Sequence, residues 1–510
     1  MFATGSKEGT SLTARAALMI FAKTLAFACN FAIPLLLVRR LAQNDFGIYK
    51  QIFLFVETAM LILPLGFPLS AYYFLPRDEE RRGHVVFNLL LFSLTVGCLA
   101  ALMLFLQPAL LASLFNNAEL TGYAPLIGLI ILLWILSALL EVIVVAHQET
   151  RLATLLIIAA QFTKAILFLA AVVWFSSVKA ILYAAIIHGA LQTTLLLFYV
   201  RSRFVNFWRG FEWPVMRAQL SYALPLGIAG VIFGLQWSLD NYFVSYRFGA
   251  ADYAIYAVGC FQLPLMAILT DAVASVMIPR SSALQKSDAR REIIVLTTNM
   301  MRKVSAIYLP LYVFLLVAGR EFILVLFTSQ YIRSWPIFAV NITLIPLCIL
   351  ASACDPVMRA FAEHRYFLLK ARIITLSVLV LALWYGTQRF GMLGAITIAI
   401  GINVVERLIV TLKVKRHLGV TGGDLPLFKD MGKLLVAAIL AGLGASAARL
   451  LLAGSPAWVV LFVCGGIFLF IYLAAIPLLG ILKDEEHQMI RRVAAEWLPF
   501  KSWEAKSAER

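Results

Sequence analysis

The chain has 510 residues and a formal net charge of +16, with 62% of its residues hydrophobic and 14% charged. Soluble globular domains are about 45–50% apolar and about 25% charged, so this composition excludes an ordinary soluble protein. Because basic residues gather in the cytoplasmic loops of membrane proteins, the positive charge indicates membrane topology rather than nucleic-acid binding.

Apolar runs recur along the whole chain, and many reach the roughly 20 residues that a helix needs to cross a bilayer. Backbone polar groups in hydrocarbon must be satisfied within the segment, so these runs predict an all-α polytopic membrane protein. The predicted spans, about fourteen in number, are residues 14–38, 47–75, 85–114, 122–146, 153–175, 180–200, 217–246, 253–278, 297–318, 336–360, 367–386, 392–414, 430–453 and 457–480. The connecting segments on one side hold most of the Lys and Arg residues, which predicts that this side, with both termini, is cytoplasmic.

A ten-residue pattern occurs twice, at Arg40–Tyr49 and, 207 residues later, at Arg247–Tyr256. Arg, Asp, Ile and Tyr match in register, and Phe46 corresponds to Tyr253. Six predicted helices separate the copies, so both enter the membrane in the same direction and the two halves are expected to be related by an axis along the membrane normal. The predicted division is a first lobe over 1–200, a linker over 201–216, a second lobe over 217–415, two further helices over 416–482 and a cytoplasmic tail over 483–510.

The first copy resembles the signature of a transporter family. That signature reads roughly hydrophobic-Ala-Arg-x-Leu-Gly-x-x-x-Phe-Gly-x-Tyr and precedes a helix rich in Leu and Gly; the matching residues here are Arg40, Phe46, Gly47, Tyr49, Leu65 and Gly66. Ala42 stands in place of the usual Gly, which the second copy keeps at Gly249. The chain therefore resembles the polysaccharide-transporter branch of the multidrug/oligosaccharidyl-lipid/polysaccharide flippase superfamily, which includes the O-unit flippases.

This resemblance implies two six-helix lobes around a central cavity that opens alternately to each side. It implies a flippase that moves a polyprenyl-pyrophosphate-linked oligosaccharide to the periplasmic leaflet of a bacterial inner membrane, for surface polysaccharides such as the O-antigen of lipopolysaccharide. A polysaccharide polymerase, glycosyltransferases and membrane lipids are the expected partners. The alternatives are an ion-coupled multidrug exporter of the same superfamily and, with less support, a membrane-embedded glycan polymerase or ligase.

A charged side chain at the bilayer centre costs about 2.5–3.5 kcal/mol on insertion scales, so each one needs a reason. Lys23 and Asn30 lie seven residues apart in the first predicted helix, hence on one face, where an ammonium would attract a phosphate. The alternative for Lys23 is an ion pair or a position at the interface. The residues predicted to bind substrate, in the cavity and at its gates, are Lys23, Asn30, Arg40, Glu57, Arg77, Arg247 and Arg280.

The four arginines of this set lie at helix ends, where anchoring of the helix is the favoured alternative. Arg77 and Arg280 are the better substrate candidates, because loading begins at the cytoplasmic leaflet. Glu57 and Lys164 are most simply a structural ion pair, although Glu57 could instead face the cavity. Glu141 is a weaker candidate for substrate binding.

Energy coupling would depend on buried carboxylates, which can bind a proton or, with amide oxygens, Na⁺. The ion-coupling candidates are Asp240, Asn241, Asp271, Asp355 and Glu406. Helix capping and ion pairs within a lobe are the alternatives for Asp240 and Asp271. A histidine inside a span, His188, is more simply a hydrogen-bonded bundle residue than a proton relay. The sequence has no GxxxxGK[ST] loop, HExxH motif or GxSxG elbow, so we expect a transporter without cofactor or metal site, and not an enzyme.

Overall fold

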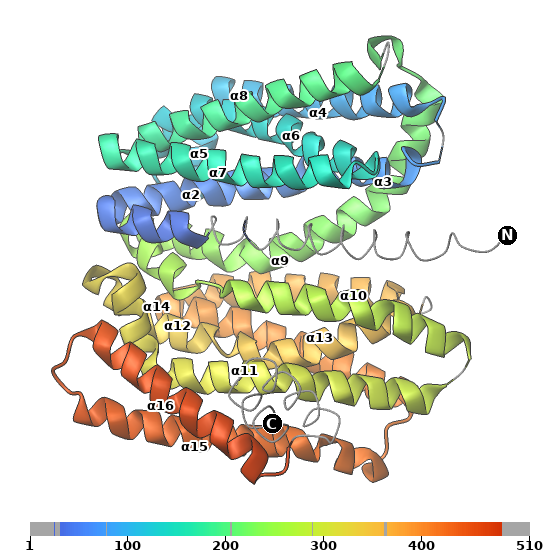
Figure 1. The fold of residues 1–510 in the computed structure, drawn as a ribbon. Coiled ribbons are helices and arrows are strands. Elements are labelled where there is room, and N and C mark those ends of the chain that lie inside the picture. Colours follow the sequence, from blue (N-terminus) through green and yellow to red (C-terminus); the bar gives the residue numbers. More distant parts are fainter. Residues whose placement is uncertain are drawn as a thin grey trace, which may run out of the picture. The chain divides into compact units, whose positions relative to one another are not determined.

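The computed structural model describes Leu25 and residues 31–77, 79–204, 207–287, 289–361 and 365–481. Throughout this described part the regular elements are helices, and no strand is present (Figure 1). The prediction of an all-α membrane protein is therefore confirmed. The tail predicted over 483–510 lies outside the described residues.

Ten helices of the described residues are long and apolar enough to cross a membrane, or up to eleven if one bent pair counts as a single span. The predicted number of fourteen is not confirmed. Two kinks account for part of the difference: α9 (Trp213–Gly259) bends at Gly249 and α14 (Arg365–Leu418) at Gly391, where φ is 78° and 63°. The spans predicted over 367–386 and 392–414 are thus the two arms of α14.

The described chain forms two compact units, which do not follow chain order throughout. The first takes its residues from 1–269, 326–341 and 362–408, and the second from 270–325, 342–361 and 409–510. The helices of the first unit are α2 (Gln43–Ile62), α3 (Ser70–Phe74), α4 (Arg82–Leu106), α5 (Ala109–Phe115), α6 (Ala124–Ala146), α7 (Thr150–Phe175), α8 (Val178–Arg203), α9, α12 (Trp335–Asn341) and most of α14. Those of the second are most of α10 (Pro264–Lys286) and α11 (Arg290–Phe327), with α13 (Leu344–Ala360), α15 (Lys429–Leu451) and α16 (Ala457–Leu478).

Helix α6 is the centre of packing in the first unit, with α2, α3, α4, α7 and α8 against it. Its mean hydropathy is high and its buried face is formed by aliphatic side chains, which pack tightly in a bundle. The core at one end of this bundle includes Leu75, Val86, Leu139, Ile143 and Leu196, all almost fully buried. These contacts fix the positions of α6 and α8, which carry several of the polar residues described below.

The two copies of the repeated pattern meet where α2 and α9 run side by side (Figure 1). Gly47 faces the backbone of Ala250 so closely that a Cβ atom would lie 1.8 Å from the Ala250 carbonyl oxygen. Gln43 Nε2 donates a hydrogen bond to the Ala251 carbonyl at 2.9 Å. Gly47 in the first copy is thus required, because the backbone of the second copy approaches it too closely for a larger side chain.

The helix predicted as continuous over 47–75 is broken in the structure. It ends at Ile62, and the chain continues through the 3-10 helix η1 (Phe67–Leu69) into α3, at an angle of 49° to α2. Leu65 and Gly66 have φ angles of 46° and 71°, and the Leu65 carbonyl contacts α9 so closely that a Cβ on Gly227 would lie 1.9 Å from it. Left-handed backbone cannot continue a helix, so α3 is directed away from the axis of α2.

The second unit is held by a few polar contacts between otherwise apolar helices. Arg449 on α15 binds Glu321 on α11 through two nitrogens, at 2.9 and 3.0 Å. The Tyr472 hydroxyl on α16 donates to the Ala306 carbonyl at 2.9 Å. These bonds fix α15 and α16 against α11.

Candidate functional site

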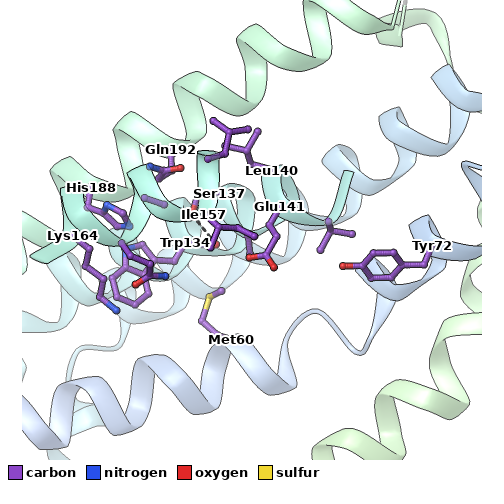
Figure 2. A pocket seen from close by; sticks show the side chains of 15 residues that line it. Met60, Tyr72, Trp134, Ser137, Leu140, Glu141, Ile157, Lys164, His188 and Gln192 are labelled. Carbon is purple, nitrogen blue, oxygen red and sulfur yellow. Dashed lines mark hydrogen bonds between the residues drawn. The ribbon is translucent and has the colours of Figure 1, made fainter. Parts of the chain in front are cut away.

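A cavity of about 430 Å³ lies inside the first unit, between α2, α3, α6, α7 and α8 (Figure 2). Its volume is within the range of about 300–1,000 Å³ that is usual for ligand pockets. The lining residues are Met60, Tyr72, Trp134, Ser137, Ala138, Leu140, Glu141, Val142, Leu156, Ile157, Ala160, Gln161, Lys164, His188 and Gln192. Polar and apolar side chains are mixed along its walls, in a segment of chain that is otherwise strongly apolar.

Helical periodicity explains why these residues share the cavity. Trp134 and Glu141 lie two turns apart on α6, Ile157 and Lys164 two turns apart on α7, and His188 and Gln192 one turn apart on α8. Residues at these spacings lie on one helix face. Seven residues of helix rise about 10 Å, which gives the approximate length of the polar wall.

Lys164, Trp134 and His188 form one end of the cavity (Figure 2). Lys164 Nζ lies 5.1 Å from the centroid of the Trp134 ring, and the Trp134 indole is fixed by a hydrogen bond to the Ala185 carbonyl at 3.1 Å. Glu57 lies on α2, the helix that contributes Met60 to the cavity, and its pairing with Lys164 stays a prediction. A cation over an aromatic face is stabilised by the ring quadrupole.

Glu141 and Tyr72 form the opposite end, where Figure 2 shows the Tyr72 hydroxyl directed toward the cavity. Tyr72 is 44% exposed, so this end is accessible from outside the bundle. Within the described part of the chain, His188 Nδ1 is buried and has no hydrogen-bond partner. Buried polar atoms are normally satisfied, so this nitrogen indicates a place for a water molecule or a ligand atom.

The predicted substrate residues are placed by the structure as follows. Lys23 and Asn30 lie outside the described residues. Glu57, Arg40, Arg247 and Arg280 are exposed, and none of them lines the cavity.

Arg77 is exposed just after α3, and its guanidinium stacks on one aromatic ring. Its guanidinium lies 3.6 Å from the centroid of the Tyr73 ring, and the Tyr73 and Tyr222 rings are 4.6 Å apart. Tyr73 and Tyr222 are both more than one third exposed. The guanidinium therefore lies on an open aromatic surface, close in the chain to the cavity residue Tyr72.

Asp240 and Asn241 belong to a buried hydrogen-bonded group on α9. The Tyr256 hydroxyl donates to Asp240 Oδ2 at 2.5 Å, and Asn241 Nδ2 lies 3.3 Å from Asp240 Oδ1. The Tyr253 hydroxyl lies 3.4 Å from Asn241 Oδ1. Tyr253 and Tyr256 are residues of the second repeated pattern, so this pattern supplies partners to the predicted coupling residues.

Glu406 forms a second buried group, with residues that the sequence patterns did not indicate. Gln236 Nε2 donates to Glu406 Oε2 at 2.7 Å, and Arg372 Nε lies 3.4 Å from Glu406 Oε1. The Arg372 guanidinium also lies 4.5 Å from the centroid of the Phe233 ring. A basic residue inside the span predicted over 367–386 was the sequence signal that could have identified Arg372.

The other coupling candidates, Asp271 and Asp355, belong to the second unit, on α10 and α13, and Asp271 is exposed. Within the described residues no group of three or more His, Cys, Asp or Glu side chains could hold a metal ion.

The cavity as a whole was not predicted from the sequence. Lys164, Glu141 and His188 each stood out singly, as ionisable residues inside apolar spans. Tyr72, Gln161 and Gln192 carry no such signal, because uncharged polar side chains are common in membrane helices. Only the packing of α6, α7 and α8 brings these residues to one cavity.

Comparison with known proteins identifies a family and a fold. A family model described as polysaccharide biosynthesis protein matches residues 36–336. No curated protein sequence matches the chain.

Solved structures of transporters have the same fold. Lipid II flippase MurJ in an inward closed conformation aligns with a TM-score of 0.70 at 11% identity, over 90% of this chain and 98% of that one. An inward-facing multidrug resistance MATE family transporter of the MOP superfamily aligns with a TM-score of 0.61 at 14% identity, over 77% and 94%. A MOP superfamily transporter from Pyrococcus furiosus, described as having a binding pocket of reverse polarity, aligns with a TM-score of 0.54 at 15% identity, over 79% and 94%.

Proposed function

Because the chain belongs to the polysaccharide biosynthesis protein family, within the polysaccharide-transporter branch that its sequence resembles, we propose that it is a flippase for a lipid-linked oligosaccharide. The substrate would be a glycan on polyprenyl pyrophosphate, moved from the cytoplasmic to the periplasmic leaflet by alternating access. Family and fold indicate a transporter rather than a catalytic enzyme.

The observation that carries this proposal is the mixed polar cavity inside a membrane-spanning bundle. A glycan cannot enter hydrocarbon without losing its hydrogen bonds to water, which is costly for each unpaired group. The carboxylate of Glu141, the amides of Gln161 and Gln192 and the imidazole of His188 offer replacement partners within the membrane-spanning helices. Ionisable residues inside membrane spans mark substrate or ion pathways by default.

The proposal has three further elements, which are the points where helices bend, the coupling ion and the cellular location. The kinks at Gly249 and Gly391 and the break at Leu65–Gly66 are places where helices could change direction between inward-open and outward-open states. Coupling to H⁺ or Na⁺ would use carboxylates within the helices, with Asp240 and its neighbour Asn241 the leading candidates and Asp271, Asp355 and Glu406 the others. We place the protein in a bacterial inner membrane with both termini cytoplasmic, acting with glycosyltransferases and a polymerase that assemble surface polysaccharide such as O-antigen.

A reconstituted flipping assay tests the proposal. The purified chain is placed in vesicles that contain a fluorescent polyprenyl-pyrophosphate oligosaccharide, and a glycosidase is added outside. Without flipping, only the outer-leaflet share is cleaved; with the chain present, we expect the inner-leaflet share to be cleaved as well. Protection of the inner-leaflet share, with the chain correctly folded, would refute the proposal.

A multidrug exporter is the second candidate, favoured by the fold of the multidrug transporter structures and by the carboxylate of Glu141 in the cavity wall. An acidic wall would suit cationic drugs. The two functions separate in the same vesicles, because an exporter should accumulate ethidium under an imposed proton or sodium gradient, whereas the flippase should leave ethidium outside and still expose the labelled lipid.

A further inference from the structure

The short helix α3 connects the cavity to the exposed guanidinium of Arg77. Tyr72 lines the cavity, and the next residue, Tyr73, carries the stacked Arg77 side chain at 3.6 Å. The two features therefore lie on consecutive residues of one helix. Successive residues of a helix are rotated by about 100°, so Tyr72 and Tyr73 present the two features on adjacent sides of α3.

Buried polar contacts hold α3 in place. Asn88 on α4 donates to Gln219 on α9 at 3.1 Å, and Gln219 donates to the Ser70 hydroxyl at 3.2 Å. The Ser70 hydroxyl in turn donates to the Phe67 carbonyl at 2.7 Å. All three side chains are fully buried. The first residue of α3 is thereby tied to two other helices, so Tyr72 and Tyr73 are presented by a supported element.

The chemistry of the two features is complementary to a sugar phosphate. A guanidinium presents planar donors that match phosphate oxygens and stacks on aromatic rings without losing its charge. The cavity offers acceptors and donors for hydroxyl groups at Glu141, Gln161 and Gln192, and its ring faces suit the C–H faces of sugars. The unpartnered Nδ1 of His188 lies at the far end from Tyr72 (Figure 2).

We propose that the cavity and the Arg77–Tyr73 pair form one two-part binding site for the head group of a lipid-linked oligosaccharide. The pyrophosphate binds at Arg77, and the sugars nearest to it enter past Tyr72 and lie along Glu141, Gln161 and Gln192. This inference rests on the proposed function and adds the location at which the first unit receives its substrate, together with the assignment of phosphate and sugar to separate parts of it.

The test compares two ligands and one matched pair of variants. The ligands are the lipid-linked oligosaccharide extracted from cells that express the chain and the same polyprenyl pyrophosphate without sugar. Ala160→Trp fills the cavity, because Ala160 lines it, whereas Ala159→Trp places the same ring on the exposed side of α7. Binding is measured on purified protein in lipid nanodiscs.

We expect Ala160→Trp to weaken binding of the oligosaccharide lipid about tenfold or more, the loss of a few hydrogen bonds, and to leave binding of the sugar-free lipid unchanged. Ala159→Trp should change neither. Arg77→Gln should weaken both lipids by a similar factor, about tenfold for a lost charge-assisted bond. Gln192→Met, which adds no bulk, repeats the cavity test if Ala160→Trp does not fold.

The outcomes separate this inference from the proposed function. If the wild-type chain binds and flips the oligosaccharide lipid while both cavity variants bind it normally, the two-part site is wrong and the flippase proposal stands. A loss in Arg77→Gln that is confined to the oligosaccharide lipid would likewise refute the assignment of phosphate to Arg77. If the wild type binds neither lipid better than phosphatidylglycerol and flips none, the proposed function itself fails.

Discussion

Two groups of polar residues inside the first unit differ in what lies between their side chains. Around Glu141, Gln161 and Gln192 there is a cavity of about 430 Å³. Around Glu406 the space is filled by the protein itself, because Gln236 donates to one carboxylate oxygen at 2.7 Å and Arg372 lies against the other at 3.4 Å. Both groups contain a carboxylate in a membrane-spanning helix, and only the first leaves room for a ligand.

The difference shows that an ionisable residue in a membrane span is insufficient to define a transport site. Arg372 and Glu406 lie on the two arms of α14, on either side of the kink at Gly391, so their ion pair closes the helix on itself. Gln236 then fixes both arms to α9, because its Nε2 donates to Glu406 Oε2 on one arm and lies 3.3 Å from Thr375 Oγ1 on the other. This group has the properties of a structural brace, whereas the cavity residues have those of a binding site.

Breaking the buried group around Glu406 is expected to have the largest effect on stability. Arg372→Met leaves Glu406, whose side chain is 7% exposed, without its cation. A buried charge that loses its partner costs about 3 kcal/mol, so we expect the free energy of unfolding, measured by chemical denaturation in detergent micelles, to fall by about that amount.

The double variant Arg372→Met/Glu406→Gln is the control, because it removes both charges and should recover most of the lost stability. Unchanged stability in Arg372→Met would contradict the interpretation of this group as a brace and would leave Glu406 as a coupling candidate.

Sequence patterns predicted what depends on composition and periodicity, and missed what depends on contacts between helices. The apolar runs predicted the helical membrane fold, and the pattern at Arg40–Tyr49 indicated the family. The pairing of Arg372 with Glu406 joins residues 34 positions apart, whose proximity follows from the kink in α14. Likewise, no local signal placed Tyr72 at the same cavity as Glu141, because the break at Leu65–Gly66 sets the direction of α3.

The contact between the repeated patterns is tightly packed, the opposite extreme from the cavity. Gly47→Ala would place a methyl group 1.8 Å from the Ala250 carbonyl oxygen, so α2 and α9 must separate. Overpacking of this kind typically costs about 1–3 kcal/mol, and we expect about 2 kcal/mol in the same unfolding measurement. Gly230→Ala on α9, where a Cβ would contact nothing within 4 Å, should be neutral or slightly stabilising. Equal effects of the two substitutions would refute the packing argument.

The Asp240 group is intermediate, since it is buried and hydrogen-bonded, and its described contacts include no ion pair of the kind seen at Glu406. Tyr256→Phe removes the 2.5 Å hydrogen bond to Asp240, and we expect a loss of about 1 kcal/mol, the usual size for polar contacts between membrane helices. Tyr253→Phe removes a longer bond of 3.4 Å to Asn241 and should cost less. The free energy of unfolding of both variants is measured by chemical denaturation. A larger loss in Tyr253→Phe than in Tyr256→Phe would show that the hydroxyl of Tyr253 is the one that fixes this segment.

The cavity should show the smallest change in stability and the clearest change in function. Glu141 is exposed to the cavity, so Glu141→Gln removes a charge without leaving a buried partner. Substitutions of this kind are usually within about 0.5 kcal/mol of neutral. The flipping rate in vesicles should nevertheless fall, by roughly tenfold, if the carboxylate accepts a hydrogen bond from the substrate.

Glu119→Gln, on the exposed 3-10 helix η2 (Ala118–Tyr123), is a matched control that makes the same chemical change outside the cavity and should leave both stability and flipping unchanged. The comparison between the two groups then becomes quantitative, because Arg372→Met should lower flipping only in proportion to the protein that unfolds, while Glu141→Gln should lower it in protein that is fully folded. A variant at Glu141 that unfolds as readily as Arg372→Met would show that the cavity is held together by this carboxylate and is not free to exchange its contacts with a substrate.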